Sequence, residues 1–193
     1  NREEVTELCF EGEDLVATIV SEIAGSPAAR SERHARITHD GISPDPTPMS
    51  TVIGIVNATA VKGCYLPRSL VSGQRWSYAV ELDSPLQTSS VTASLSVLGV
   101  EDVFVPAGRF EAVRIESTLR NRMVGKKSAD APSGIELPSI DYTQLEETYW
   151  ARGVGLIKAV TRMSTGHEST KVLVGFSPGG TFSALISQAG LKF

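Results

Sequence analysis

The sequence of 193 residues lacks a long hydrophobic run, and no apolar stretch approaches the roughly 20 residues that a membrane-spanning helix requires. It also lacks an excess of positive charge, because 18 Lys and Arg residues stand against 22 Asp and Glu residues, giving a formal net charge of -4. A nucleic-acid-binding protein needs clustered positive charge. The sequence therefore predicts a chain with no transmembrane segment and no nucleic-acid partner.

Cysteine and histidine are scarce, with two and three residues respectively. Cys9 and Cys64 are far apart in the sequence and form either one long-range disulfide in an oxidising compartment or two separate buried thiols. Neither has another Cys or a His at ligand spacing. His34, His39 and Asp40 are the one cluster of histidines, but a structural metal site needs about four converging ligands. We therefore expect no metal and no cofactor.

Recognisable catalytic motifs are missing as well. Glu146 and Glu147 are adjacent, and neighbours on a strand point to opposite faces, so they cannot work as a paired acid and base. We interpret them as solvent or edge charges, and Glu101-Asp102 fails by the same argument. No Gly-x-Ser-x-Gly elbow occurs, and a strand pattern rather than a helix follows Gly153-Val154-Gly155. The sequence predicts a protein that is not an enzyme, with an enzyme of unrecognised site as the remote alternative.

Strand patterns are what the sequence does contain. Apolar and hydroxyl residues alternate with period 2 over residues 91–97, which predicts a strand with one buried and one wet face. Pro106 and Gly108 then fit a tight turn, so we expect a long hairpin over about residues 90–122. A second hairpin is predicted over residues 144–163, and a further strand over residues 171–176.

The amino-terminal part is less regular. Residues 5–10 and 33–38 each favour a strand. Residues 15–23 could form a short helix capped by Asp14, but their branched side chains favour a strand. Two loops are expected, at residues 41–48 with their three prolines and at residues 125–138, the second being either a flap over an opening or a surface excursion.

The carboxy-terminal tail predicts a short helix beginning at Thr181. Phe182, Leu185, Ile186 and Ala189 follow helical spacing and would give it one apolar face. Such a helix would cover an open sheet edge or fill a cavity. At the other end, the chain opens on Asn1 without a Met, which fits either a removed export signal or an arbitrary boundary.

Three segments resemble the motifs of a widespread bacterial domain of unknown function. They are Gly73-Gln74-Arg75-Trp76-Ser77-Tyr78, Val105-Pro106-Ala107-Gly108-Arg109-Phe110 and Tyr149-Trp150-Ala151-Arg152-Gly153-Val154-Gly155-Leu156-Ile157-Lys158. In that family a G-x-x-W-x-Y strand, a V-P-A-G-x-F hairpin and a W-Y-A-x-G-V-G-L-V-K turn recur, and the resemblance covers about residues 65–176. This chain reverses the order of the aromatic pair at Tyr149-Trp150 and inserts residues 125–138.

The resemblance implies an exported protein, often a lipoprotein or a periplasmic domain, built on a strongly curved antiparallel sheet. This sheet is similar to the half-barrel of the lipoprotein carriers, whose concave face can hold acyl chains. It implies no catalytic residues. The location implied is the cell envelope or periplasm of a bacterium, with any lipid anchor carried by an N-terminal segment removed from this chain.

Together these patterns predict a mainly β fold, a single domain over residues 1–193 in which a curved antiparallel half-barrel sheet is joined by one or more short helices, including the C-terminal one. The expected function is a non-catalytic envelope or secreted domain that binds a lipid or another hydrophobic ligand on the concave face. The alternative is a structural module that docks another envelope protein. Aromatic and aliphatic residues near the motifs are the candidate lining, although they could equally be ordinary core: Trp76, Tyr78, Phe104, Phe110, Trp150 and Leu156.

Overall fold

The computed structural model describes residues 2–11, 14–23, 26–44, 49–51, 54–126 and 138–175. Throughout these residues the secondary structure is β, and no helix occurs among them. The prediction of a mainly antiparallel β fold is therefore confirmed, whereas the predicted short helices are not seen there. The helix predicted from Thr181 lies outside the described residues.

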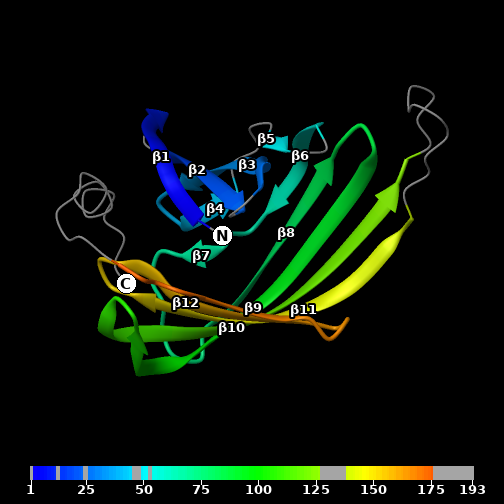
Figure 1. Cartoon of the computed structure of the whole chain (residues 1–193). Coiled ribbons are helices and arrows are strands. Elements are labelled where there is room, and N and C mark those ends of the chain that lie inside the picture. The colour runs from blue at the N-terminus through cyan, green and yellow to red at the C-terminus, as the bar shows by residue number, and fades with distance from the viewer. Residues whose placement is uncertain are drawn as a thin grey trace. The chain divides into compact units, whose positions relative to one another are not determined.

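Two sheets make up the described chain (Figure 1). The first has five strands in the order β1-β2-β3-β4-β7: β1 (Arg2–Glu11), β2 (Asp14–Ile23), β3 (Ser26–Ile37), β4 (Gly41–Pro44) and β7 (Leu66–Pro67). The second has eight strands in the order β13-β12-β11-β10-β9-β8-β6-β5, whose bounds are β5 (Met49–Thr51), β6 (Gly54–Lys62), β8 (Arg75–Asp83), β9 (Gln87–Val105), β10 (Gly108–Gly125), β11 (Ile140–Ala151), β12 (Gly155–Met163) and β13 (Glu168–Val172).

The two long hairpins form where the sequence predicts them. β9 and β10 are neighbours in the sheet and are separated by the turn at Pro106 and Ala107. Gly108 has a φ of 135°, which only glycine adopts readily. β11 and β12 pair antiparallel, and a register shift between Tyr149 and Trp150 leaves Ile157 of β12 without a partner on β11, as in a β-bulge.

Several element boundaries differ from the sequence predictions. Residues 41–44, expected in a loop, form β4, because Ala35 to Ile37 of β3 supply a partner for their backbone. β13 covers Glu168–Val172 rather than residues 171–176. β6 (Gly54–Lys62) was not predicted from its sequence pattern. The ambiguous segment 15–23 is indeed a strand, β2, which pairs with both β1 and β3.

The chain divides into two compact units. Unit 1 comprises residues 1–66, 78–92 and 121–141, and unit 2 comprises residues 67–77, 93–120 and 142–193. β8, β9, β10 and β11 each contribute residues to both units. The single domain over residues 1–193 remains a prediction.

Unit 2 has a closed hydrophobic core at one end of its strands. Val103, Ala112, Tyr149, Ala151 and Ile157 form this cluster, which we call the strand-end core. Partly buried residues pack against it: Val105, Phe110, Val154 and Leu173.

The backbone closes around the strand-end core through Leu173. The N–H of Leu173 donates to the carbonyl of Ile157 at 2.9 Å, and the carbonyl of Leu173 accepts from Ala107 at 3.2 Å. Leu173 therefore joins β12 to the turn between β9 and β10. The strand-end core therefore draws its side chains from four adjacent strands, β9 to β12, whose residues are distant in sequence.

Candidate functional site

The two faces of β11 in unit 2 carry different chemistry. Glu147, Tyr149 and Ala151 share one face, on which the strand-end core lies, because alternate residues of a strand point the same way. Glu146 and Trp150 lie on the other face. The sequence prediction that Glu146 and Glu147 point apart is confirmed by their different partners. Their interpretation as solvent or edge charges is wrong, because β11 lies between β10 and β12 and both side chains are half-buried.

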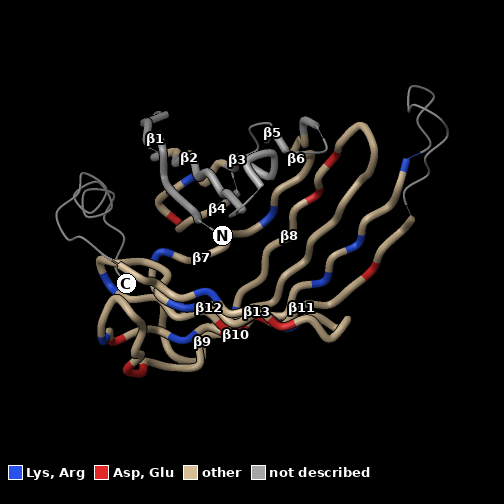
Figure 2. Tube along the Cα trace, in the orientation of Figure 1, with Lys and Arg blue, Asp and Glu red and all other residues tan. Residues whose placement is uncertain are grey.

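A row of alternating charges crosses five adjacent strands, β9 to β13, on the face of Glu147. Arg114 donates to Glu147 at 2.8 Å and lies 3.8 Å from Glu101. Arg162 donates to Glu147 at 3.1 Å and to Glu168 at 3.0 Å. We call these five residues the charged row, and Figure 2 shows charges of both signs along the eight-stranded sheet. The hydrogen bond from Arg162 holds the pKa of the Glu147 carboxyl below its usual range, and Arg114 adds to this effect.

Tyr149 links the charged row to the strand-end core. The guanidinium of Arg114 lies 6.0 Å from the centre of its ring, and the ammonium of Lys158 lies 5.1 Å from it. Its hydroxyl donates to Glu147 at 3.3 Å. Burial raises the pKa of this hydroxyl. The charged row and Tyr149 thus form one network of ion pairs and ring contacts across the sheet.

The opposite face of β11 and β12 carries two of the predicted lining residues. Trp150 and Leu156 are cross-strand partners, and both are half-buried. Glu146 lies four residues from Trp150 on the same side of β11, and accepts a hydrogen bond from Thr161 at 3.3 Å. Burial raises the pKa of the Glu146 carboxyl, while the Thr161 hydrogen bond and the charge of Lys171 oppose the rise. This face therefore combines large apolar side chains with one half-buried acid.

The two predicted phenylalanines of unit 2 lie in different environments. Phe110 packs against the strand-end core and is part of its lining. Phe104 is 74% exposed, since its neighbours Val103 and Val105 take the core side of β9. The guanidinium of Arg109 lies 5.5 Å from the centre of the Phe104 ring and pairs with Asp102. These two phenylalanines are therefore not brought together in one lining.

The remaining two predicted residues lie on β8, on one side of that strand. Trp76 belongs to unit 2 and Tyr78 to unit 1, and both are half-buried. Tyr78 packs edge-on against Tyr65, with ring centres 4.7 Å apart and planes at 87°. Val80, two residues further along, is buried. In unit 1 this side of β8 thus faces packed side chains.

Cys64 is half-buried and forms no disulfide with a described side chain. Burial raises its pKa, and the charge of Asp40 raises it further, so the reactive thiolate is disfavoured. The backbone of Cys9 lies in β1, but its side chain lies outside the side chains that the structure describes. The Cys9–Cys64 bridge remains a prediction.

His34 and His39, which the sequence groups with Asp40, have different hydrogen-bond partners in the structure. His34, on β3, has its Nδ1 atom 3.2 Å from the hydroxyl oxygen of Thr18 on β2. His39 and Asp40 are exposed, with the ring and the carboxylate 3.3 Å apart. Across the described residues no group of three His, Cys, Asp or Glu side chains has the arrangement of a metal site.

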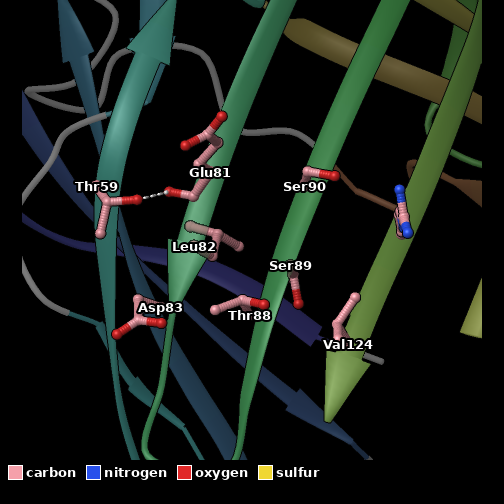
Figure 3. Close-up of a pocket in the computed structure, with 9 residues that line it drawn as sticks. Thr59, Glu81, Leu82, Asp83, Thr88, Ser89, Ser90 and Val124 are labelled. Atoms are coloured by element: carbon pink, nitrogen blue, oxygen red, sulfur yellow. Dashed lines mark hydrogen bonds between the residues drawn. The ribbon is translucent and has the colours of Figure 1, made fainter. Parts of the chain in front are cut away.

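A pocket of about 330 Å³ opens in unit 1 over four strands, β6, β8, β9 and β10. Figure 3 shows residues 81–83 on one strand, residues 88–90 on the next and Val124 on a third. The hydroxyl of Thr59 donates to the backbone carbonyl of Glu81 at 3.3 Å. Polar side chains dominate the lining, which is Thr59, Glu81, Leu82, Asp83, Thr88, Ser89, Ser90, Arg122 and Val124.

This pocket was not predicted from the sequence. Its one signal was the run of Thr and Ser at residues 88–90, but hydroxyls at alternate positions of a strand are also the pattern of an ordinary wet face. Glu81 and Arg122 are more than 40 positions apart in the sequence. Only the strand order β8-β9-β10 brings both to one pocket.

No family model and no curated protein matches the sequence. Among solved structures, a candidate lipoprotein from Parabacteroides distasonis is similar, at 10% identity and a TM-score of 0.40. The alignment covers 85% of this chain and 87% of that one. A likeness this remote carries no conclusion about this protein.

Within the described ranges, no helix has the length and apolar character needed to cross a bilayer.

Proposed function

We propose that this chain is a non-catalytic domain of the bacterial cell envelope that holds a hydrophobic ligand, such as a lipid, against one face of its sheet. The observation that carries the proposal is the Trp150–Leu156 pair of unit 2. These large apolar side chains lie on the face of β11 that does not hold the strand-end core, and both remain partly accessible. Apolar surface of this kind gains roughly 25 cal/mol for each Å² that a ligand covers.

The same face offers a polar group to orient an amphiphile. Glu146 is half-buried there, and its hydrogen bond from Thr161 keeps it in place. Apolar pockets usually gain their specificity from a few such polar groups. In this proposal the sheet curves so that the face with Trp150 is concave, and the acyl chain lies along it with its polar end toward Glu146.

The envelope location rests on the three motifs that resemble the exported bacterial domain. A direct check is fractionation of the native bacterium followed by immunoblotting. Recovery in the envelope or periplasmic fraction is expected, and recovery in the cytoplasmic fraction would refute this part of the proposal.

Ligand binding is tested by native mass spectrometry of the protein purified from its own envelope fraction, followed by organic extraction and lipid analysis. We expect a co-purifying lipid at near-stoichiometric amounts. Leu156→Glu places a charge on the proposed face and should abolish the adduct. Val172→Glu is the matched control. Val172 is 41% exposed and is the cross-strand partner of Lys158, which contacts the Tyr149 ring on the opposite face of the sheet.

Thermal unfolding of both variants separates loss of binding from loss of folding. A folded Leu156→Glu protein without the adduct supports the proposal. A native protein that carries no lipid, and whose melting temperature does not change when lipid vesicles are added, would overturn it.

A second candidate function is docking of another envelope protein, and exposed apolar side chains in unit 2 favour it. Phe104 is 74% exposed and Val174 is 77% exposed, although Phe and Val are among the residue types most often buried. Exposed apolar side chains mark an interface where they form a contiguous patch, as this second proposal requires of Phe104 and Val174. Cross-linking in intact cells should capture one defined partner with the native protein and lose it with Phe104→Ser, whereas Val124→Ser in unit 1 should leave the capture unchanged.

A further inference from the structure

The pocket of unit 1 contains two charged side chains that have no ion-pair partner among the described residues. Asp83 forms an ion pair with Lys126. Glu81 and Arg122, in contrast, form no ion pair or side-chain hydrogen bond to another described residue through their charged groups, although both line the pocket. Within the described part of the chain, the pocket therefore carries one unpaired negative charge and one unpaired positive charge.

The two unpaired charges stand on different strands with hydroxyl groups between them. Glu81 is on β8 and Arg122 on β10, and β9 lies between these strands. Neighbouring strands are about 4.8 Å apart, so the two backbones are separated by on the order of 10 Å. Thr88 and Ser90 of β9, which both line the pocket, occupy the intervening space. Across the pocket, the acid Glu81 is therefore followed by the hydroxyls of Thr88 and Ser90 and then by the base Arg122.

We propose that this pocket binds a small zwitterion of the amino-acid class, with its ammonium group at Glu81 and its carboxylate at Arg122. Each end of such a ligand meets a charge of opposite sign, and the hydroxyls of Thr88 and Ser90 can bond to polar groups between its ends. A simple anion or a simple cation would leave one of the two protein charges unpaired. A sugar would find no aromatic side chain to stack on, since none is among the lining residues.

This proposal is independent of the hydrophobic ligand, because Trp150 and Leu156 belong to unit 2 and every residue of the pocket belongs to unit 1. The two unpaired residues of the pocket, Glu81 and Arg122, are exposed. Exposed ion pairs contribute only about 0.2 to 1 kcal/mol each. We therefore expect binding in the millimolar range, with fast exchange.

The test uses unbranched ω-amino acids of increasing length as a ruler. Glycine, 3-aminopropanoate, 4-aminobutanoate and 6-aminohexanoate are titrated into the isotope-labelled protein, and amide shifts are followed by NMR. Affinity should pass through a maximum along this series, and the shifts should centre on residues 81–83, 88–90 and 122–124. Butanoate and butylamine, each with one charge, should bind at least about threefold more weakly than 4-aminobutanoate.

Charge-removing variants identify which side chains act. Glu81→Gln and Arg122→Gln should each weaken binding of the best zwitterion by about fivefold, the effect of losing one exposed ion pair. Glu81→Gln should leave butanoate binding unchanged, and Arg122→Gln should leave butylamine binding unchanged. Arg120→Gln is the matched control, because Arg120 is an exposed arginine two residues away on β10 that does not line the pocket.

Three results would overturn the proposal: no shifts in the pocket with any zwitterion, equal binding by butanoate and 4-aminobutanoate, or equal effects of Arg120→Gln and Arg122→Gln. None of these outcomes bears on the lipid measurement, so the two proposals can fail separately.

Discussion

Two groups of charged residues on this sheet differ in what neutralises them. In the charged row of unit 2, Arg114 and Arg162 alternate with Glu101, Glu147 and Glu168, so each residue lies beside an opposite charge. In the pocket of unit 1, the charges of Glu81 and Arg122 have no such neighbour among the described residues. A charged strand surface can thus serve either stability or binding, and the pairing of the charges distinguishes the two uses.

The largest expected effect concerns the strand-end core beside the charged row. Ile157→Ala removes a side chain that is only 1% exposed, and should lower the free energy of unfolding by about 3 kcal/mol through lost burial and the cavity left behind. Val124→Ala, at the rim of the pocket, should cost less than about 1 kcal/mol. Urea unfolding of both variants measures the difference, and equal losses would contradict the contrast between a closed and an open region.

Breaking the charged row should have the next largest effect. Arg114→Met keeps most of the apolar stem but removes both ion pairs and the contact with the Tyr149 ring. The Nε atom of Arg114 is buried without a hydrogen-bond partner in the described structure, so its removal offsets part of the loss. We expect a net cost of about 1 kcal/mol. A double-mutant cycle with Glu147→Gln should show favourable coupling, and zero coupling would exclude a stabilising role for the row.

The two adjacent glutamates should respond oppositely to pH. The folded-state pKa of Glu147 is lowered, so its contribution is fully present above the ordinary glutamate pKa of roughly 4.3 and is lost as the pH falls through the folded value. The folded-state pKa of Glu146 is raised, so its carboxylate destabilises the fold at neutral pH and this penalty disappears in acid.

Unfolding experiments from pH 3 to pH 7 test this difference. Glu147→Gln should lower stability at pH 7 and have little effect at pH 3. Glu146→Gln should raise stability at pH 7, and the gain should vanish at pH 3. Changes of the same sign for both variants at pH 7 would show that the two faces of β11 do not differ as described.

The smallest effect is expected in the pocket. Glu81→Gln and Arg122→Gln should each change the free energy of unfolding by less than about 0.5 kcal/mol, because neither charge has an ion-pair partner to lose. The same two variants should still weaken zwitterion binding. A stability loss as large as that of Arg114→Met would indicate that these charges serve the fold.

The strands with strong local signals were predictable. The alternation of residues 91–97 and the turn at Pro106 and Gly108 placed the β9–β10 hairpin, since period-2 patterning and turn chemistry act within a few residues. β4 could not be found in this way. Its proline-rich segment has no strand pattern, and it becomes a strand because β3 provides hydrogen-bond partners.

The candidate site was predicted only in part. The sequence predicted Trp150 and Leu156 on the two arms of one hairpin, and the register of β11 and β12 makes them cross-strand partners. It could not show that Phe110 packs against the strand-end core while Phe104 is exposed. Both are apolar residues of the same hairpin, and the core forms on the side where Tyr149, Ala151 and Ile157 of β11 and β12 complete the cluster.

The sequence by itself determined the mainly β character, the main hairpins and the opposite orientation of Glu146 and Glu147, because these follow from the period and the turns of a single strand pair. The tertiary structure alone decided the strand order, the closed core of unit 2, the charged row and the pocket with Glu81 and Arg122. The physical reason is that these features join residues on strands that are distant in sequence. Their pairing depends on the free energy of the whole sheet and not on any local pattern.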